Sequence, residues 1–125
     1  MSLFHAVVWL DHHVALVQQF SPDDVQAHKV KDHAHYTRQH HSGVRTEHEF
    51  FGDVCDALAG VSEILVTGGH DAQADFRHYV EKHRPALKPH ILGWQTVDHP
   101  TDGQLVALAR EYFRTLDRTG LPAQT

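Results

Sequence analysis

Histidine is the residue type that most distinguishes this sequence, with fourteen histidines among 125 residues. Six of them lie within residues 28–48, a stretch with few aliphatic side chains and no regular spacing of apolar residues. Neutral imidazoles are ligands of zinc and nickel, whereas protonated imidazoles add positive charge. The stretch therefore offers two chemistries, metal binding and the binding of an anionic partner.

A zinc or nickel site is one interpretation of this stretch. His33 and His35 are spaced to place both imidazoles on one face of an extended segment. Zinc takes three or four ligands in a tetrahedron. The candidate ligands are His33, His35, His40, His41 and His48, with Glu47 or Glu49 as a carboxylate. No familiar zinc-binding motif is present, and a solvated loop whose imidazoles bind nothing in the cell would have the same composition.

RNA binding is the other interpretation, through a loop of about residues 31–45. Cationic side chains contact phosphates, and tyrosine and histidine rings stack on bases. The candidate contacts are Lys31, Tyr36, Arg38, His40, His41 and Arg45. A charged loop that only keeps the protein in solution is the alternative.

The net charge limits where such contacts can lie. It is −5 at pH 7 with every histidine neutral, and protonation of all fourteen would bring it to +9. A free histidine titrates near pH ~6.5. RNA contact at neutral pH must therefore be local, and we expect it to strengthen on acidification. Equal RNA binding at about pH 6 and about pH 8 would contradict this expectation.

Length and composition predict one globular domain, with 41% hydrophobic and 22% charged residues. Cys55 is the only cysteine, so no internal disulfide can form, which is typical of a reducing cytoplasm. The amino-terminal apolar run contains His5 and follows no basic segment, so we expect neither a signal peptide nor a membrane span. We expect a domain over residues 1–118 and a flexible tail over residues 119–125.

Apolar runs of strand length predict three strands at the start of the chain. Residues 3–10 are apolar nearly throughout, as in a central strand buried on both faces. Residues 14–20 follow a short polar turn and should form a hairpin with them. Residues 25–30 are a weaker strand, with Val25, Ala27 and Lys29 on one face. We place this strand at an edge of the sheet, where a second copy of the chain could pair with it.

Three helices and two strands follow, with strands over residues 64–67 and 90–97. The helix starts are predicted by a capping box of Thr46 and Glu49, by Asp71, and by a capping box of Thr101 and Gln104. Gly60 ends the first helix, and His83 the second. The expected inner faces are Phe50, Phe51, Val54, Cys55, Leu58 and Ala59, then Phe76, Tyr79 and Val80, then Leu105, Leu108, Ala109, Tyr112, Phe113 and Leu116.

The order of elements is therefore β-β-β-α-β-α-β-α. Tight turns join antiparallel strands, and helical crossovers join parallel ones. We predict an α/β domain with a mixed five-stranded sheet and helices on its faces, the topology of the ribonuclease H-like fold. Trp9 and Trp94 are expected in central strands as part of the core.

Three segments carry a family resemblance: FHAVVWLDHHVALVQQF, EILVTGGHDAQADFRHYV and HILGWQTVDHPTDGQLVALAREYF. They resemble the middle domain of archaeo-eukaryotic class-1 peptide chain release factors and its short bacterial relatives, often called translational machinery proteins. The resemblance covers about residues 3–116, and its best single match runs from Gly68-Gly69 to Phe76.

The resemblance implies a cytoplasmic bacterial accessory protein that binds ribosomes or RNA, with no DNA or membrane partner. In release factors a Gly-Gly-Gln motif lies between the third strand and the first helix. Here that place holds the histidine-rich stretch, and Gly68-Gly69 is followed by His70. We therefore expect no peptide release and, more generally, no enzymatic activity.

Two further sites are compatible with this fold. Ribonuclease H-like nucleases hold two metal ions on carboxylates, and Asp11, Asp71 and either Glu47 or Glu49 fall near the corresponding elements. Turn and helix-capping roles explain the same residues. Residues 68–70 and 98–100 could line a small pocket at the carboxyl edge of the sheet, or be ordinary loops.

Overall fold

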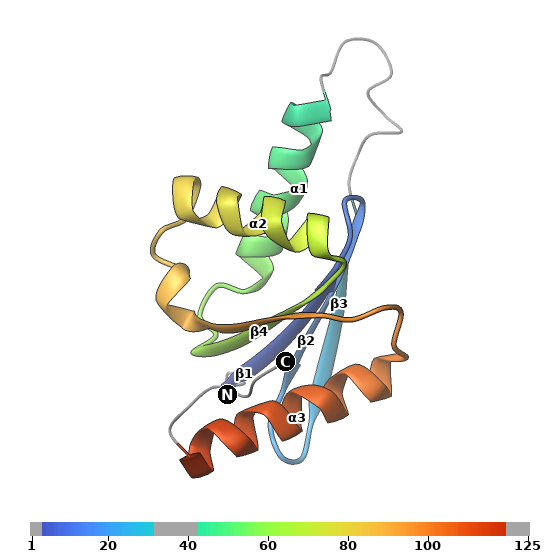
Figure 1. The fold of residues 1–125 in the computed structure, drawn as a ribbon, viewed down its shortest axis with the longest axis vertical. Coiled ribbons are helices and arrows are strands. Elements are labelled where there is room, and N and C mark those ends of the chain that lie inside the picture. The colour runs from blue at the N-terminus through green and yellow to red at the C-terminus, as the bar shows by residue number, and fades with distance from the viewer. Residues whose placement is uncertain (1–3, 32–42, 120–125) are drawn as a thin grey trace.

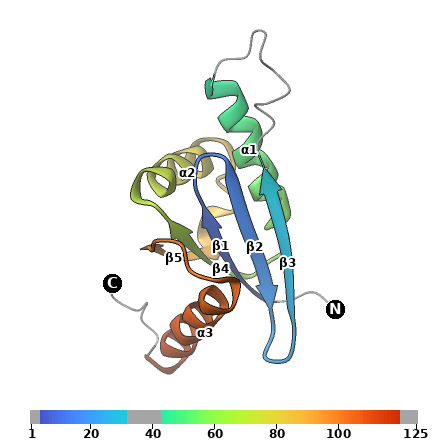
Figure 2. The same cartoon turned by 90° about the vertical axis from the view of Figure 1, so that its right-hand side faces the viewer.

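Five strands form one mixed sheet in the order β3-β2-β1-β4-β5 (Figures 1 and 2). The computed structural model describes residues 4–31 and 43–119, with side chains for residues 4–31 and 48–116. Strand β2 is antiparallel to both β1 and β3, whereas β1, β4 and β5 are parallel. The strands are β1 (His5–Leu10), β2 (Val14–Phe20), β3 (Val25–Lys31), β4 (Glu63–Gly68) and β5 (Ile91–Thr96). The predicted α/β architecture and strand directions are confirmed.

Helices cover both faces of this sheet. Helices α1 (Gly43–Ala57) and α2 (His70–His83) lie on one face, and α3 (Asp102–Thr119) lies on the other (Figures 1 and 2). A short 3-10 helix, η2 (Lys88–His90), precedes β5. None of the described helices is both long and apolar enough to cross a membrane.

Alternate side chains of the central strands belong to two hydrophobic cores, one on each face of the sheet. Ala6, Val8 and Leu10 of β1 pack into the core beneath α1 and α2. Val7, which lies between Ala6 and Val8 along β1, packs with Leu65 into the core beneath α3. All of these side chains are fully buried, because successive strand residues point to opposite faces and both faces are covered. This explains why β1 is apolar almost throughout, as predicted.

The two edge strands differ from the central ones. Val30 is the one buried residue of β3, and Val25, Ala27 and Lys29, which lie together on the other face, are all exposed. This confirms the edge position predicted for β3. Strand β5 pairs with β4 and forms the other edge, so the prediction that Trp94 lies in a central strand was wrong. Its indole is half-buried and packs near Phe76.

The helix starts correct two predictions. Helix α1 begins at Gly43, so Thr46 and Glu49 lie inside it and do not cap it. Helix α2 is preceded by Gly69 as its N-cap residue, so Asp71 lies in the first turn, where its carboxylate complements the helix dipole.

The capping box of α3 is confirmed. The Gln104 N–H donates to Thr101 Oγ1 at 3.1 Å, and the Thr101 N–H donates to Gln104 Oε1 at 2.9 Å. Among the predicted inner-face residues, Ala59 lies beyond α1 and is exposed, whereas Tyr79, Leu108 and Leu116 are half-buried. Val106, which the helical pattern did not single out, is buried.

Candidate nucleic-acid interface

Both ends of the predicted RNA-binding loop of residues 31–45 lie in regular structure, because residue 31 belongs to β3 and residues 43–45 belong to α1. Lys31 ends β3, is exposed, and pairs in register with Val14 of β2. Arg45 lies in the first turns of α1, and its side chain is outside the described residues. The other candidate contacts and ligands are outside them too: His33, His35, Tyr36, Arg38, His40 and His41. Their roles stay predictions.

A shallow groove of about 470 Å³ runs between β3 and α1. Strand β3 contributes His28, Lys29 and Lys31 to its lining, and α1 contributes Asp53 and Asp56. The groove therefore mixes cationic and anionic side chains and is not a uniformly basic surface.

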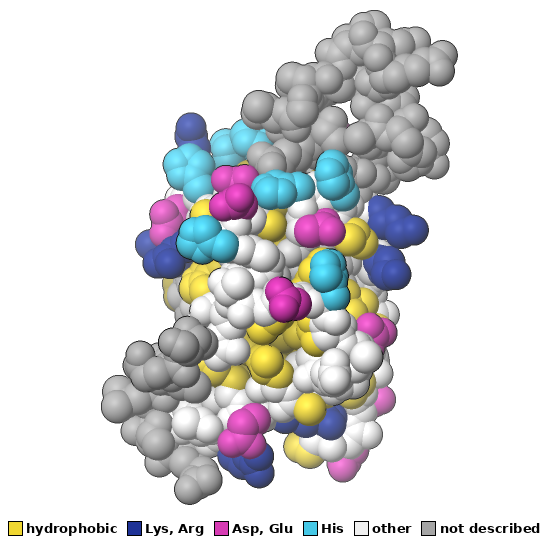
Figure 3. Space-filling model, turned by 45° about the vertical axis from the view of Figure 1, so that its right-hand side comes forward, with side chains coloured by type: hydrophobic (Ala, Val, Ile, Leu, Met, Phe, Trp, Pro, Cys, Tyr) yellow, Lys and Arg dark blue, Asp and Glu magenta, His cyan; other side chains and the backbone are white. Residues whose placement is uncertain are grey.

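A cluster of rings lies on the neighbouring surface between α1 and α2. The ring of His48 is 5.4 Å from that of Tyr79 and 5.2 Å from that of His83. The Tyr79 and His83 rings are 4.9 Å apart, so all three are in mutual contact. Figure 3 shows histidine side chains gathered on the half of the molecule that α1 and α2 occupy in Figure 1. Sequence analysis missed this cluster because helix packing, and no local motif, brings His48 to His83.

The ring cluster borders a hollow of about 110 Å³. Asp75, His78 and Lys82 of α2 complete its lining, with Phe51 at its base. His12, from the turn between β1 and β2, places Nε2 at 2.9 Å from Asp75 Oδ2. The lining of the hollow therefore combines aromatic rings with one lysine, Lys82, and one carboxylate, that of Asp75.

Metal-binding geometry is absent from the described part of the chain. No three histidine, cysteine, aspartate or glutamate side chains there are arranged to hold an ion. Among the predicted zinc ligands, the side chains of His48 and Glu49 are described: His48 packs against rings, and Glu49 is exposed on α1.

The carboxylates considered for a nuclease lie on different elements of the structure. Asp11 Oδ1 accepts the N–H groups of His13 at 2.7 Å and Val14 at 2.8 Å, which fixes the turn after β1. Glu49 is exposed on α1, and Asp71 is exposed in the first turn of α2. The side chain of Glu47 lies outside the described residues.

The carboxyl edge of the sheet is held together by Gln73. Its buried amide donates to Gly68 O at 2.8 Å and to Gln95 O at 3.0 Å, and it lies 3.3 Å from Thr96 Oγ1. This side chain thus links β4 to β5 at the place where a pocket was considered.

The loop of residues 98–100 packs on Trp9 at the same edge. The Trp9 indole donates to Asp98 O at 2.6 Å, and its ring lies 4.9 Å from that of His99. These contacts favour the interpretation of this region as ordinary strand-to-helix loops.

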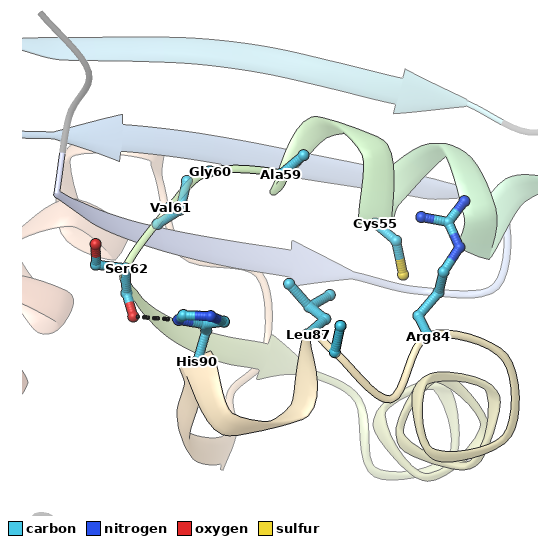
Figure 4. A pocket seen from close by; sticks show the side chains of 9 residues that line it. Cys55, Ala59, Gly60, Val61, Ser62, Arg84, Leu87 and His90 are labelled. Atoms are coloured by element: carbon cyan, nitrogen blue, oxygen red, sulfur yellow. Dashed lines mark hydrogen bonds between the residues drawn. The ribbon is translucent and has the colours of Figure 1, made fainter.

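A separate cavity of about 330 Å³ lies where α1 meets the loop after α2 (Figure 4). Cys55, Leu87 and Arg84 point toward it, and a His90 Nδ1 to Ser62 O contact of 3.0 Å closes one end. Burial raises the pKa of Cys55 to about 12, so the thiol stays protonated at neutral pH. This cysteine is a buried apolar residue, as predicted, and not an activated nucleophile.

Comparison with solved structures identifies the architecture. Pelota from Archaeoglobus fulgidus superimposes on 91% of this chain with a TM-score of 0.66 and 15% sequence identity. The fold is similar to that of archaeal Pelota. Pelota from Thermoplasma acidophilum (TM-score 0.62, 19% identity, 97% of this chain) and the archaeal translation termination factor aRF1 (TM-score 0.58, 13% identity, 91% of this chain) match as well.

These similarities establish the fold and not the activity. The ribonuclease H-like fold class is confirmed, as is the structural likeness to a release-factor domain. The matching regions span 32%, 35% and 39% of the three neighbours, about a third of each. A comparison with protein-family models finds no match, and a comparison with curated protein sequences finds none either.

Proposed function

We propose that this protein is a non-enzymatic accessory factor of translation that binds the ribosome or RNA through the loop of residues 31–45. The observation that carries the proposal is the fold likeness to Pelota proteins and to an archaeal translation termination factor. A shared fold alone is weak evidence for function. The proposal therefore also depends on side chains that suit RNA.

The residues around the loop support contact with an anionic polymer. Lys29 and Lys31 are exposed at the end of β3, where the loop of residues 31–45 begins, and Lys82 is exposed on α2. The loop itself adds Arg38 and Arg45 in a chain whose net charge is −5. This local concentration of cations is what phosphate binding requires in an acidic protein.

Peptide release is not part of the proposal. The chain contains no Gly-Gly-Gln, and its Gly-Gly pair has a structural explanation. Gly68 has φ of +139°, and a Cβ atom there would lie 2.2 Å from Leu10 O. Gly69 is the N-cap residue of α2. The pair thus serves the packing of β4 and the start of a helix.

Co-sedimentation with purified bacterial ribosomes tests the proposal. The variant Lys31→Ala/Arg38→Ala/Arg45→Ala removes three loop cations. We expect the ribosome-bound fraction to fall at least about tenfold, because each lost cation contact with a phosphate weakens binding.

The matched control is Arg77→Ala/Arg110→Ala/Arg114→Ala, which removes the same number of positive charges from exposed positions outside the loop and leaves Glu81 paired with Lys88. We expect this control to co-sediment nearly as the natural sequence does. An equal loss of ribosome binding in both variants would show that net charge, and not the loop, determines the binding. Absence of ribosome binding by the natural sequence would overturn the proposal.

A further inference from the structure

The hollow between α1 and α2 has a composition suited to one unit of a polymer. Pockets that enclose a whole small molecule usually measure about 300 Å³ or more. This hollow measures about 110 Å³, which suits one ring or one phosphate group. A polymer that places one of its units in this hollow would continue along the protein surface on either side.

Three rings form a fixed platform at this hollow. Tyr79 is half-buried, and its ring lies 5.7 Å from the buried Phe51 and contacts both His48 and His83. Both imidazoles are exposed. Because the Tyr79 ring packs against the buried Phe51, the two imidazoles that contact Tyr79 are held in position as well. Flat rings held in this way are what an unpaired RNA base stacks on.

The charges around the platform suit a phosphate next to a stacked base. Lys82 forms no ion pair within the part of the chain that the structure describes. Its neighbour Glu81 is engaged by Arg77 at 3.5 Å and by Lys88 at 3.4 Å. Asp75 is the carboxylate in the lining and would repel a phosphate, although His12 contacts it at 2.9 Å. Lys82 is therefore the cation available to an anion here.

We propose that the surface formed by His48, Tyr79, Lys82 and His83 binds one nucleotide of single-stranded RNA, with its base on the imidazole rings and a phosphate at Lys82. The site rests on the proposed RNA binding and extends it beyond residues 31–45. His48 follows Arg45 by less than one turn of α1, so one strand of RNA can reach both places.

Fluorescence anisotropy with a labelled single-stranded RNA of about ten nucleotides tests the site. The variant His48→Ala/Lys82→Ala/His83→Ala removes both exposed rings and the cation. We expect its affinity to fall about 10- to 100-fold. The control His90→Ala/His99→Ala/Arg114→Ala removes two exposed histidines and one exposed cation elsewhere, keeps both partners of Glu81, and should stay within about twofold.

Two further variants separate the roles of ring and charge. His83→Phe keeps a flat ring and should keep most of the affinity that His83→Ala loses. Asp75→Asn removes the carboxylate that repels phosphate and should raise the affinity about two- to fivefold. Equal losses in His83→Phe and His83→Ala would overturn base stacking at this position.

The outcomes distinguish this site from the loop. If RNA binds and depends on Lys31, Arg38 and Arg45, but the triple variant of the hollow matches its control, the site between α1 and α2 is wrong and the proposed function stands. If the natural sequence binds ribosomes but not this RNA, the site is likewise wrong and the proposed function stands. If it binds neither, both are wrong.

Discussion

The buried thiol of Cys55 makes stability depend on pH in the alkaline range. Its side chain is 2% exposed, and burial raises its pKa in the folded protein to about 12. An unfolded thiol titrates near pH ~8.5. Since the folded pKa is the higher one, the contribution to stability is complete below pH ~8.5 and is lost as pH rises above it.

We therefore expect the free energy of unfolding to fall by about 1.4 kcal/mol per pH unit above pH ~8.5 through this group. Urea titrations between about pH 8.5 and pH 9.5 measure the slope below the range in which tyrosines ionise. The comparison is Cys55→Ala, which lacks the thiol and should show a shallower slope. The same slope in both proteins would contradict the assignment.

At the scale of elements, one side chain joins β4 to β5. The Gln73 amide donates to the carbonyl oxygens of Gly68 and Gln95. Gln73→Ala should cost about 1–3 kcal/mol, the range for a lost buried hydrogen-bond partner. Gln73→Glu should cost more at neutral pH, because a carboxylate would then face oxygen atoms and could not donate.

Chemical denaturation of both variants measures the difference. The control is Gln26→Ala on the exposed edge strand β3, which should change stability by less than about 0.5 kcal/mol. Equal costs for Gln73→Ala and Gln73→Glu would show that the donor role of the amide is not what stabilises the sheet edge.

Elements were predictable from the sequence to the extent that local patterns determine them. The continuous apolar run of β1 and the capping box of α3 are local signals, and both are confirmed. Thr46-x-x-Glu49 is equally local but occurs inside α1, because the same spacing suits a helix interior. Sheet order is not local, so the sequence placed Trp94 in a central strand when β5 is an edge.

The candidate site was less predictable than the fold for the same reason. His48 and His83 meet only because α1 and α2 pack side by side on one face of the sheet. The sequence showed an excess of histidine and the stretch where it is densest. It could not show which imidazoles share a surface with Tyr79 and Lys82, since that depends on long-range packing.

At the scale of the whole molecule, the described cations and histidines proposed to contact RNA lie outside the two hydrophobic cores, whereas Tyr79 packs against one of them. The two hydrophobic cores described here are built from strand and helix residues and the turn residues Leu58 and Val61, with β1 shared between them. Strand β3 is paired with β2 along its full length up to Lys31. The elements on either side of residues 32–42 are thus each held by their own contacts.

Replacing residues 32–42 with a glycine- and serine-rich segment of equal length should therefore leave the fold intact while removing ribosome binding. We expect a change in unfolding free energy of less than about 1 kcal/mol, because no described core residue is altered and a loop of the same length has a similar closure entropy. Thermal denaturation and ribosome co-sedimentation measure the two quantities on the same protein. Cooperative unfolding with undiminished ribosome binding would place the RNA contact elsewhere, and loss of cooperative unfolding would mean that these residues complete the fold.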